Sequence, residues 1–451
     1  MMTASPSRSR THWRYLPDLA SAQLPRYTSY PPATRFTDRV GPQQAAEALA
    51  MLPPDSSLSL YLHIPFCKKL CWYCGCHTSV PTLADPVETY VAALQREIER
   101  AGERAPPTAN VARIHFGGGS PDILSPTQIR AIFESLRSAF HVGQFAEIAA
   151  ELDPRGLTAP TVEAFAAAGM TRASLGVQVL DPGVQARINR IQPKEQISAA
   201  IALLKRAGVE SLNMDMMYGL PGQTTEHVVD TARFAADEDA DRVAVFGYAH
   251  VPWMKKHQKA IRDEDLAEGE ERFRQAEAAA ETLLQSGYLP IGFDHFAAPG
   301  DSLAAAERQG RLHRNFQGYT DDDTDALLGF GASAISCFPD VIFQNTPDTS
   351  AYREAIFAGR SPVVRGVALD ADDRRTAALI EGILCDFEAR IDGDLHIAAC
   401  PRLAPFIRAG LVQMHGNHLT VTSDGRPYVR NIAACFDPGF NATPARHSLA
   451  I

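Results

Sequence analysis

The chain has 451 residues, of which 45% are hydrophobic and 21% are charged, proportions typical of a folded globular protein rather than a disordered one. Its 43 basic and 53 acidic side chains give a net charge of -10, which argues against a surface built to bind nucleic acid. No apolar run approaches the ~18 residues of a membrane-spanning helix. The first twenty residues lack the apolar centre of a secretory signal, so we expect a cytoplasmic protein, with a transit peptide as the alternative.

Residues 1–52 are expected to form an amino-terminal arm, which contains the sequence PRYTSYPPATRF at 25–36. From residue 58 short β-branched or apolar runs alternate with amphipathic stretches, a pattern that predicts βα units and a parallel sheet. Six strands are predicted, at 58–64, 113–116, 147–152, 172–177, 211–217 and 242–248. Helical periodicity separates them, and Ser125 and Pro126 form a suitable cap and first turn. We therefore expect a partial (β/α)6 barrel over residues 53–300, with a doubly wound sheet as the alternative.

A cluster of cysteines follows the first predicted strand directly. Cys67, Cys71 and Cys74 have the spacing Cys-x3-Cys-x2-Cys, and Cys76 lies two residues further on. Such clustering indicates a metal site rather than a disulfide framework. The other four cysteines are scattered and are expected to be small buried hydrophobic residues: Cys337, Cys385, Cys400 and Cys435.

Thiolate sulfur is the ligand that iron-sulfur clusters require, and three cysteines on one loop leave the fourth iron of a cluster open to a small molecule. The alternative is a structural zinc ion, which normally takes four ligands from two separated pairs. Cys76 is too close to Cys74 for easy tetrahedral closure. The spacing therefore favours a four-iron four-sulfur cluster over zinc.

Further candidate residues follow the other predicted strands. The second strand ends in HFGGGSP, where Gly118 and Gly119 would let backbone carbonyls approach the ammonium group of a ligand. A phosphate-binding loop is disfavoured because the Lys-Ser/Thr ending is absent. Since a barrel places ligand contacts at the carboxyl ends of its strands, the remaining candidates are Glu151, Gln178, Arg190, Asp215 and Ala249.

The pattern changes after about residue 300. Residues 301–365 are expected to connect two units and to complete the active site, and residues 366–451 to form a smaller, mainly helical domain. A helix is predicted at 374–387, followed by two short strands around a Gly-Asn turn at 416–417 and a last helix. This order is winged-helix-like. We interpret the unit as a cover, with DNA binding as the alternative that the acidic net charge disfavours.

The cysteine spacing, with aromatic Tyr73 before the third cysteine, resembles that of the radical S-adenosylmethionine (radical SAM) superfamily. The resemblance implies that Cys67, Cys71 and Cys74 hold one 4Fe-4S cluster. It also implies that the amino and carboxylate groups of S-adenosylmethionine chelate the open iron, and that one electron from the cluster generates a 5'-deoxyadenosyl radical. The GGGSP turn is similar to the superfamily motif that holds the methionine amino group.

From residue 25 almost to the end, the chain resembles the oxygen-independent coproporphyrinogen III oxidases. The matching motifs include YLHIPFCKKLCWYCGC, HFGGGSP, ELDP, NMDMMYGLPGQT, FGYAHVP, GFDHFA and HRNFQGYT. The resemblance implies two S-adenosylmethionine molecules. The first would contact Tyr61, Gly118, Glu151 and Ile335. The second would contact Tyr73, Gly119, Ser120, Gln178, Arg190, Asp215 and Ala249. Ser120 stands where threonine is usual and keeps the hydroxyl.

The resemblance further implies that two propionates of coproporphyrinogen III become vinyl groups, giving protoporphyrinogen IX. It also implies an electron donor, an electron acceptor and a monomer. Cys76 is the catalytic candidate beside the cavity. Arg26 and Arg314 are candidates for binding substrate carboxylates, the alternative being surface ion pairs. A haem chaperone or a haem-degrading radical methyltransferase would share the cluster motif. The chaperone would need neither Cys76 nor the PRYTSYP arm, and both are present.

Overall fold

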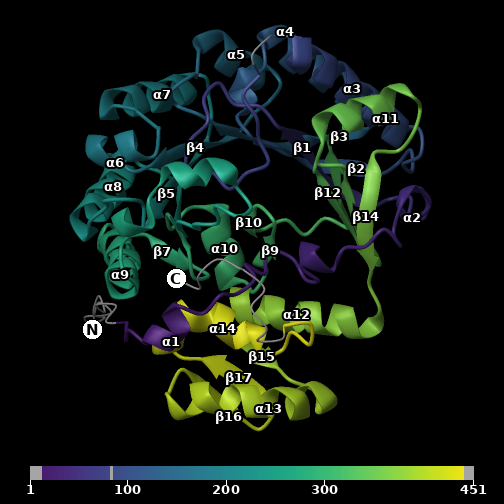
Figure 1. The fold of residues 1–451 in the computed structure, drawn as a ribbon. Helices are drawn as coiled ribbons and strands as arrows, with labels where there is room; N and C mark the ends of the chain where they lie inside the picture. The colour runs from purple at the N-terminus through teal and green to yellow at the C-terminus, as the bar shows by residue number, and fades with distance from the viewer. Residues whose placement is uncertain (1–12, 82–84, 441–451) are drawn as a thin grey trace, which may run out of the picture.

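The computed structural model describes residues 13–81 and 85–440 of the 451-residue chain (Figure 1). Over these residues, twelve strands form one sheet in the order β14-β13-β12-β11-β1-β2-β3-β4-β5-β6-β8-β7. Its centre consists of six parallel strands in chain order: β1 (Ser57–Ile64), β2 (Asn110–Gly118), β3 (His141–Leu152), β4 (Arg172–Gln178), β5 (Ser211–Tyr218) and β6 (Arg242–Gly247). All six predicted strands are present, but β3 begins at His141, six residues before its predicted start.

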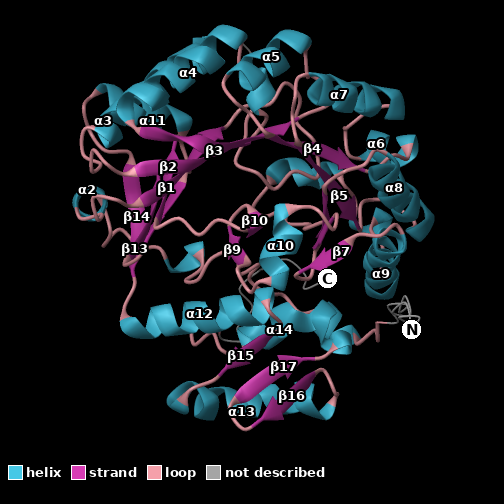
Figure 2. Cartoon of the chain, turned by 180° about the vertical axis from the view of Figure 1, so that it is seen from behind, coloured by secondary structure: helices cyan, strands magenta, loops and turns pink. Residues whose placement is uncertain are grey.

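The strand order excludes the doubly wound alternative, because β1 to β6 follow one another without the reversal that such a sheet requires. The described sheet ends at β14 and β7 and does not close. It curves around an interior, with its helices on the outer side (Figures 1 and 2). These helices are α3 (Asp85–Gly102), α4 (Pro126–Ala139), α5 (Ala159–Ala167), α6 (Pro182–Arg187), α7 (Lys194–Arg206), α8 (Thr225–Asp237) and α9 (Gly269–Gln285). The predicted partial barrel is therefore confirmed.

Local sequence explains why these elements form where they do. Leu58, Leu60 and Leu62 on one face of β1 are almost completely buried, and so are Ser59, Tyr61 and His63 on the other face, as expected for a strand covered on both sides. Helix α4 begins where predicted, because the backbone N–H of Gln128 donates to the Ser125 hydroxyl at 3.2 Å and Pro126 occupies the first turn. Such a cap fixes the residue at which the helix begins after the preceding strand.

Strands from the end of the barrel segment and from the connecting segment extend the two ends of the sheet. Next to β6, two short antiparallel strands complete one edge: β7 (Leu289–Ile291) and β8 (His295–Ala297). Strand β11 (Ala326–Phe330) pairs in parallel with β1, and the antiparallel strands β12 (Ile335–Phe338), β13 (Val341–Asn345) and β14 (Val363–Ala368) follow it outward. Between these groups lie α10 (Ser302–Arg308), the hairpin β9 (His313–Asn315) and β10 (Gly318–Thr320), and later α11 (Thr349–Phe357).

The tail forms a small unit across the open side of the barrel (Figure 1). It consists of α12 (Ala371–Cys385), β15 (Glu388–Arg390), α13 (Gly393–Arg408), β16 (Val412–His415), β17 (His418–Val421) and α14 (Val429–Ala434). His415 pairs with His418 in antiparallel register, which confirms the predicted turn at Gly416 and Asn417. Strand β15 and helix α13, which the sequence pattern does not predict, lie between the first helix of the tail and the β16–β17 hairpin.

The arm joins the tail to the barrel. Its elements are α1 (Pro17–Ala20), a 3-10 turn (Ala33–Arg35) and α2 (Pro42–Ala50). Helix α1 lies beside α14 (Figure 1), and the backbone N–H of Leu16 donates to the Tyr428 hydroxyl at 2.7 Å. Further along, Thr37 forms an antiparallel bridge with Gly366 of β14. The arm therefore contacts both the tail and the outer edge of the sheet.

Candidate active site

The cysteine loop between β1 and α3 is held on both flanks by backbone hydrogen bonds. The N–H of Cys67 donates to the Ser79 carbonyl and the N–H of Ser79 donates to the Pro65 carbonyl, both at 2.9 Å. In the middle of the loop, the N–H of Trp72 donates to the Ile188 carbonyl at 2.9 Å. These bonds present the cysteines at the carboxyl end of the first strand, where the sequence predicts the site.

A second loop, after β6, clamps the cysteine loop through its carbonyls. Lys255 Nζ donates to the Cys76 carbonyl at 2.8 Å, and His257 Nε2 lies 2.8 Å from the Cys74 carbonyl. Gln258, which is fully buried, donates to the carbonyls of Tyr73 at 2.9 Å and Ala249 at 3.2 Å. The clamp therefore connects the cysteine loop to the end of β6. Apart from its place after the FGYAHVP motif, the sequence gives no signal for these three side chains.

One cavity of about 710 Å³ contains most of the predicted residues. The predicted residues that line it are Cys67, Cys71, Tyr73, Cys74, Cys76, Gly118, Gly119, Ser120, Glu151, Gln178, Arg190, Asp215 and Ala249. Tyr61 and Ile335 do not line it. Tyr61 is buried behind Phe316, against which its ring packs edge-on at 4.8 Å between centroids. Ile335 begins β12, at the far side of β11 from β1.

Two glycines are required in the turn after β2. Gly118 adopts φ +107°, and a Cβ there would lie 2.5 Å from the His63 ring. A Cβ at Gly119 would lie 2.5 Å from the Phe66 carbonyl oxygen. The backbone of this turn can thus approach both the cysteine loop and a ligand, which fits the predicted ammonium-binding role. The Ser120 hydroxyl donates to Asp122.

Two carboxylates of the cavity differ in their preferred charge. Burial alone would raise the pKa of Glu151, but hydrogen bonds with His115 Nε2 at 3.1 Å and the Gly118 N–H at 3.2 Å lower it. Burial and the nearby charge of Glu151 raise the pKa of Asp215 to about 6, although Asn213 and Ser174 donate to it. Glu151 is therefore the permanent anion of the pair, and Asp215 titrates at mildly acidic pH.

Arg190 links the cavity to the cysteines. It forms an ion pair with Asp153 at 3.2 Å, and its Nη1 lies 3.4 Å from Cys71 Sγ. Arg155 Nη2 is 3.3 Å from the same sulfur. Within the described residues, the buried Nε of Arg190 has no hydrogen-bond partner, so this guanidinium retains a donor for a ligand. The sequence reasoning missed Arg155, and Asp153 appeared only as part of the ELDP motif.

The thiols suit a cluster better than a single ion. In the described part of the chain, no group of three or more His, Cys, Asp or Glu side chains gathers closely enough to hold one metal ion. A cubane cluster differs, because each cysteine binds a separate iron. Burial raises the pKa of the Cys67 thiol to about 12, so this residue becomes a thiolate only when a metal cation binds it. We conclude that the donor set fits the implied cluster and disfavours zinc.

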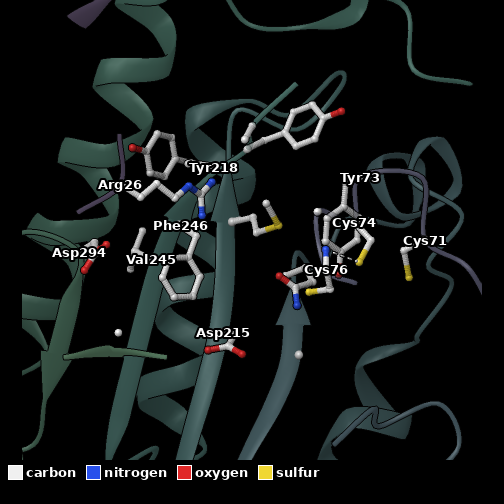
Figure 3. Close-up of a pocket in the computed structure, with 18 of the residues that line it drawn as sticks. Arg26, Cys71, Tyr73, Cys74, Cys76, Asp215, Tyr218, Val245, Phe246 and Asp294 are labelled. Carbon is white, nitrogen blue, oxygen red and sulfur yellow. Dashed lines mark hydrogen bonds between the residues drawn. The ribbon is translucent and has the colours of Figure 1, made fainter. Parts of the chain in front are cut away.

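The opposite end of the cavity is basic. Arg26 and Asp294 lie across from the cysteines (Figure 3), and Arg314 forms an ion pair with Asp294 at 3.6 Å. Burial would raise the pKa of Asp294, but Arg314 and His295 lower it to about 2. Arg430, from α14, also lines the cavity. The sequence reasoning named Arg26 and Arg314 but missed Asp294, which lies in the GFDHFA motif, and Arg430, which precedes the NIAACFD segment.

An open parallel barrel with three cysteines after its first strand defines a radical SAM enzyme, and residues 61–235 match the radical SAM superfamily. The chain is 44% identical to the oxygen-independent coproporphyrinogen III oxidase of Bradyrhizobium diazoefficiens, over 95% of this chain and 97% of that protein. It is 40% identical to the enzyme of the same name from Paracoccus denitrificans, over 96% of this chain and 98% of that one.

Structural comparison agrees. The solved coproporphyrinogen III oxidase of Escherichia coli, described as a radical SAM enzyme, superimposes with a TM-score of 0.88 at 36% identity. The match covers 93% of this chain and all of that one. The chain therefore belongs to the oxygen-independent coproporphyrinogen III oxidase family. None of the helices in the described part of the chain combines the length and apolarity needed to span a bilayer.

Proposed function

We propose that this protein converts coproporphyrinogen III to protoporphyrinogen IX without oxygen, by oxidative decarboxylation of two propionate side chains to vinyl groups. The observation that carries the proposal is a single cavity with three clustered thiols at one end and arginines at the other, in a chain of this family. The thiols suit a cluster that starts radical chemistry. The arginines suit a substrate with four carboxylates.

The cofactors in this proposal are one 4Fe-4S cluster and two S-adenosylmethionine molecules. Cys67, Cys71 and Cys74 would hold the cluster. When bound, these cofactors supply the electron and the 5'-deoxyadenosyl radical that removes a hydrogen atom from the substrate. The proposed residues for the first molecule are Tyr61, Gly118, Glu151 and Ile335. Those for the second are Tyr73, Gly119, Ser120, Gln178, Arg190, Asp215 and Ala249.

Charge supports this division of roles. Glu151 accepts the Gly118 N–H and stays ionised, so it would hold the turn and face an ammonium group. Arg190 keeps a free Nε–H for a carboxylate, while Asp215 can accept hydrogen bonds from ribose hydroxyls. The Cys76 side chain is exposed to the cavity, which supports its role as the catalytic candidate.

In the substrate, loss of a β-hydrogen from a propionate leaves a carbon radical. Cleavage of the bond to the carboxylate then releases carbon dioxide and one electron, and the remaining two carbons become a vinyl group. The electron passes to a one-electron acceptor, and a separate electron donor would reduce the cluster.

We also propose a cytoplasmic monomer without nucleic-acid or membrane partners, divided into units 1–52, 53–300, 301–365 and 366–451. Strand β14 spans the last boundary and belongs to the main sheet.

The test is an anaerobic assay with reductant, S-adenosylmethionine, coproporphyrinogen III and an electron acceptor. We expect a divinyl tetrapyrrole, carbon dioxide, methionine and 5'-deoxyadenosine. Deuterium placed at the propionate β-carbon should appear in the deoxyadenosine, because hydrogen abstraction there begins the reaction. S-adenosylhomocysteine as the product would instead indicate a methyltransferase. Tetrapyrrole bound but unchanged beside an intact cluster would indicate a haem chaperone.

A further inference from the structure

The basic end of the cavity has more positive than negative charge. Four guanidiniums line this end, those of Arg26, Arg272, Arg314 and Arg430, and Arg26 interacts electrostatically with the other three. The carboxylate of Asp294 is close to three of them, Arg26, Arg314 and Arg430. Asp294 is ionised and already engaged, with Arg314 at 3.6 Å and His295 Nδ1 at 2.6 Å. The excess charge lies in a largely enclosed space, where an anion would be bound more strongly than at the surface.

Arg26 has the free capacity to bind that anion. Its side chain is exposed to the cavity, and no residue in the described part of the chain forms a hydrogen bond or ion pair with it. Arg314 behind it is anchored, with its guanidinium 4.7 Å from the Phe293 ring centroid and 4.5 Å from that of Tyr319. The Nε and Nη1 of Arg314 also lack hydrogen-bond partners among the described residues, but both atoms are buried. Arg26 is exposed to the cavity, so its guanidinium is accessible for bidentate binding.

The arm holds Arg26 in place from both sides. Before it, Arg430 Nη2 donates to the carbonyls of Leu24 and Pro25, each at 3.1 Å. After it, the hydroxyl of Tyr27 donates to Asp437 at 3.1 Å. A side chain carried by the flexible part of a protein would lose much entropy on binding. Arg26 is instead preorganised by buried contacts with the tail.

Apolar side chains form much of the wall between the two ends of the cavity. Val245 and Phe246 lie between Asp294 and Cys76 (Figure 3), and Phe293, Phe296 and Met217 also line the space. A ligand that fits must therefore combine an apolar body with an acidic group at one end. A porphyrinogen has this combination, because its pyrrole rings are flanked by propionates.

We propose that Arg26 binds a non-reacting propionate of the tetrapyrrole, which places another propionate toward the cysteine end. The inference rests on the proposed function and adds the residue that sets the orientation of the substrate. Arg314 and Asp294 are positioning residues: the ion pair fixes Arg314 and offsets the repulsion between the guanidiniums. The rival ligand for Arg26 is the methionine carboxylate of a cofactor, so the test must separate the two.

The experiment measures equilibrium binding of coproporphyrin III, a stable analogue with the same four carboxylates, to reconstituted protein. Charge-assisted hydrogen bonds are strong enough that Arg26→Gln should raise the Kd of the porphyrin about 10- to 100-fold. Arg26→Lys should recover part of the affinity, because the charge remains but the planar fork is lost. Cluster absorbance and the number of bound S-adenosylmethionine molecules should not change.

Arg35→Gln is the matched control in the same arm. Arg35 pairs with Asp373 at 2.9 Å and does not line the cavity, so this variant should bind porphyrin like the wild type. Equal porphyrin affinity in Arg26→Gln and the wild type would overturn the inference. Loss of one bound S-adenosylmethionine with unchanged porphyrin affinity would overturn it too, in favour of the cofactor carboxylate. Wild-type protein that leaves coproporphyrinogen III unconverted would reject the proposed function instead.

Discussion

Cysteine residues in one loop differ in what surrounds their sulfur atoms. The Cys67 thiol contacts the Thr78 hydroxyl at 3.1 Å, and the Cys71 thiol contacts two arginines. Arginine donors near sulfur stabilise negative charge on a bound cluster and tune its potential. The Cys76 side chain is instead exposed to the cavity, and its backbone N–H lies 3.4 Å from Cys74 Sγ. Position in the motif alone does not reveal this difference.

The first prediction follows from the different surroundings of Cys76 and the other three cysteines of the loop. Cys71→Ala should reduce bound iron from about four atoms per chain to near zero, because in the proposed arrangement each of the three thiolates would be the only protein ligand of its iron. Cys76→Ser should keep the iron and the visible absorbance of the cluster but lose turnover. Iron analysis and absorbance spectra of anaerobically reconstituted protein provide the measurement. Cys400→Ala, which changes an exposed cysteine away from the cavity, is the control. Equal iron loss in the Cys71 and Cys76 variants would contradict the three-ligand assignment.

The second prediction concerns Asp215. Asp215→Ala should reduce bound S-adenosylmethionine from two molecules toward one while the cluster remains, as equilibrium dialysis can show. Because the pKa of Asp215 is raised to about 6, its carboxylate forms as the pH increases through 6. Affinity for the second molecule should therefore increase between pH 5 and pH 7 in the wild type. Asp215→Asn should flatten that dependence. Asp230→Ala, at an exposed position of α8, serves as control, and two molecules bound equally well by Asp215→Ala would refute the assignment.

At the scale of elements, α3 is joined to the extension of the sheet by a partly buried carboxylate. Glu97 accepts hydrogen bonds from the Gly331 N–H at 2.8 Å, from Asn345 Nδ2 at 2.7 Å and from the Tyr352 hydroxyl at 2.6 Å. These three partners lie after β11, on β13 and on α11. The contact therefore fixes α11 and the outer strands against a barrel helix.

The third prediction is a pH dependence of stability. Burial raises the pKa of Glu97 to about 7, from the ordinary glutamate value of 4.5. Between these values the unfolded state releases its proton while the folded state keeps it, so stability falls as the pH increases from about 4.5 to 7. The loss attributable to Glu97 is on the order of 2 kcal/mol. Anaerobic urea unfolding of Glu97→Gln should show a smaller loss over this range. The exposed Glu99→Gln on the same helix should behave like the wild type, and identical slopes for all three proteins would contradict the prediction.

Elements were more predictable than the contacts between them. Apolar runs such as that of β1 and capping pairs such as Ser125 and Gln128 are local signals, and the strands and helices they predict are present. The pairing of β11 with β1 joins residues more than 260 positions apart, and no local sequence pattern predicts it. Gln258 shows the same limit at a site: its three hydrogen bonds to the two loops depend on tertiary approach, so its sequence position alone gave no reason to select it.

For the whole molecule, the arm and tail act together as one wall of the active site. The arm contributes Arg26 and Thr28 to the cavity, and the tail contributes Pro427 and Arg430. The expectation of a tail that covers the barrel is consistent with this arrangement. Arg430 of the tail faces the arm, because its guanidinium donates to the carbonyls of Leu24 and Pro25.

The last prediction tests whether the tail positions the arm. Asp437 is buried and accepts hydrogen bonds from the hydroxyls of Tyr27 at 3.1 Å and Tyr30 at 3.4 Å, the two tyrosines of the PRYTSYP sequence. Asp437→Ala should leave both hydroxyls without their acceptor and cost roughly 2–4 kcal/mol of stability. Because the arm carries Arg26, the KM for coproporphyrinogen III should increase about tenfold. Cluster content and the cleavage of S-adenosylmethionine without substrate should stay near wild-type values, since the hydrogen bonds of Asp437 among the described residues go to the arm and to the tail itself.

Steady-state kinetics and limited trypsin digestion measure the two effects separately. Trypsin cleaves after arginine, so a loosened arm should be cut after Arg26 sooner in Asp437→Ala than in the wild type. Asp437→Asn keeps an acceptor oxygen and should restore most of the affinity. Asp394→Ala, at an exposed position of α13, should change neither measurement. An Asp437→Ala protein with lower stability but an unchanged KM would mean that the tail only stabilises the fold, because positioning of Arg26 requires substrate affinity and arm protection to fall together.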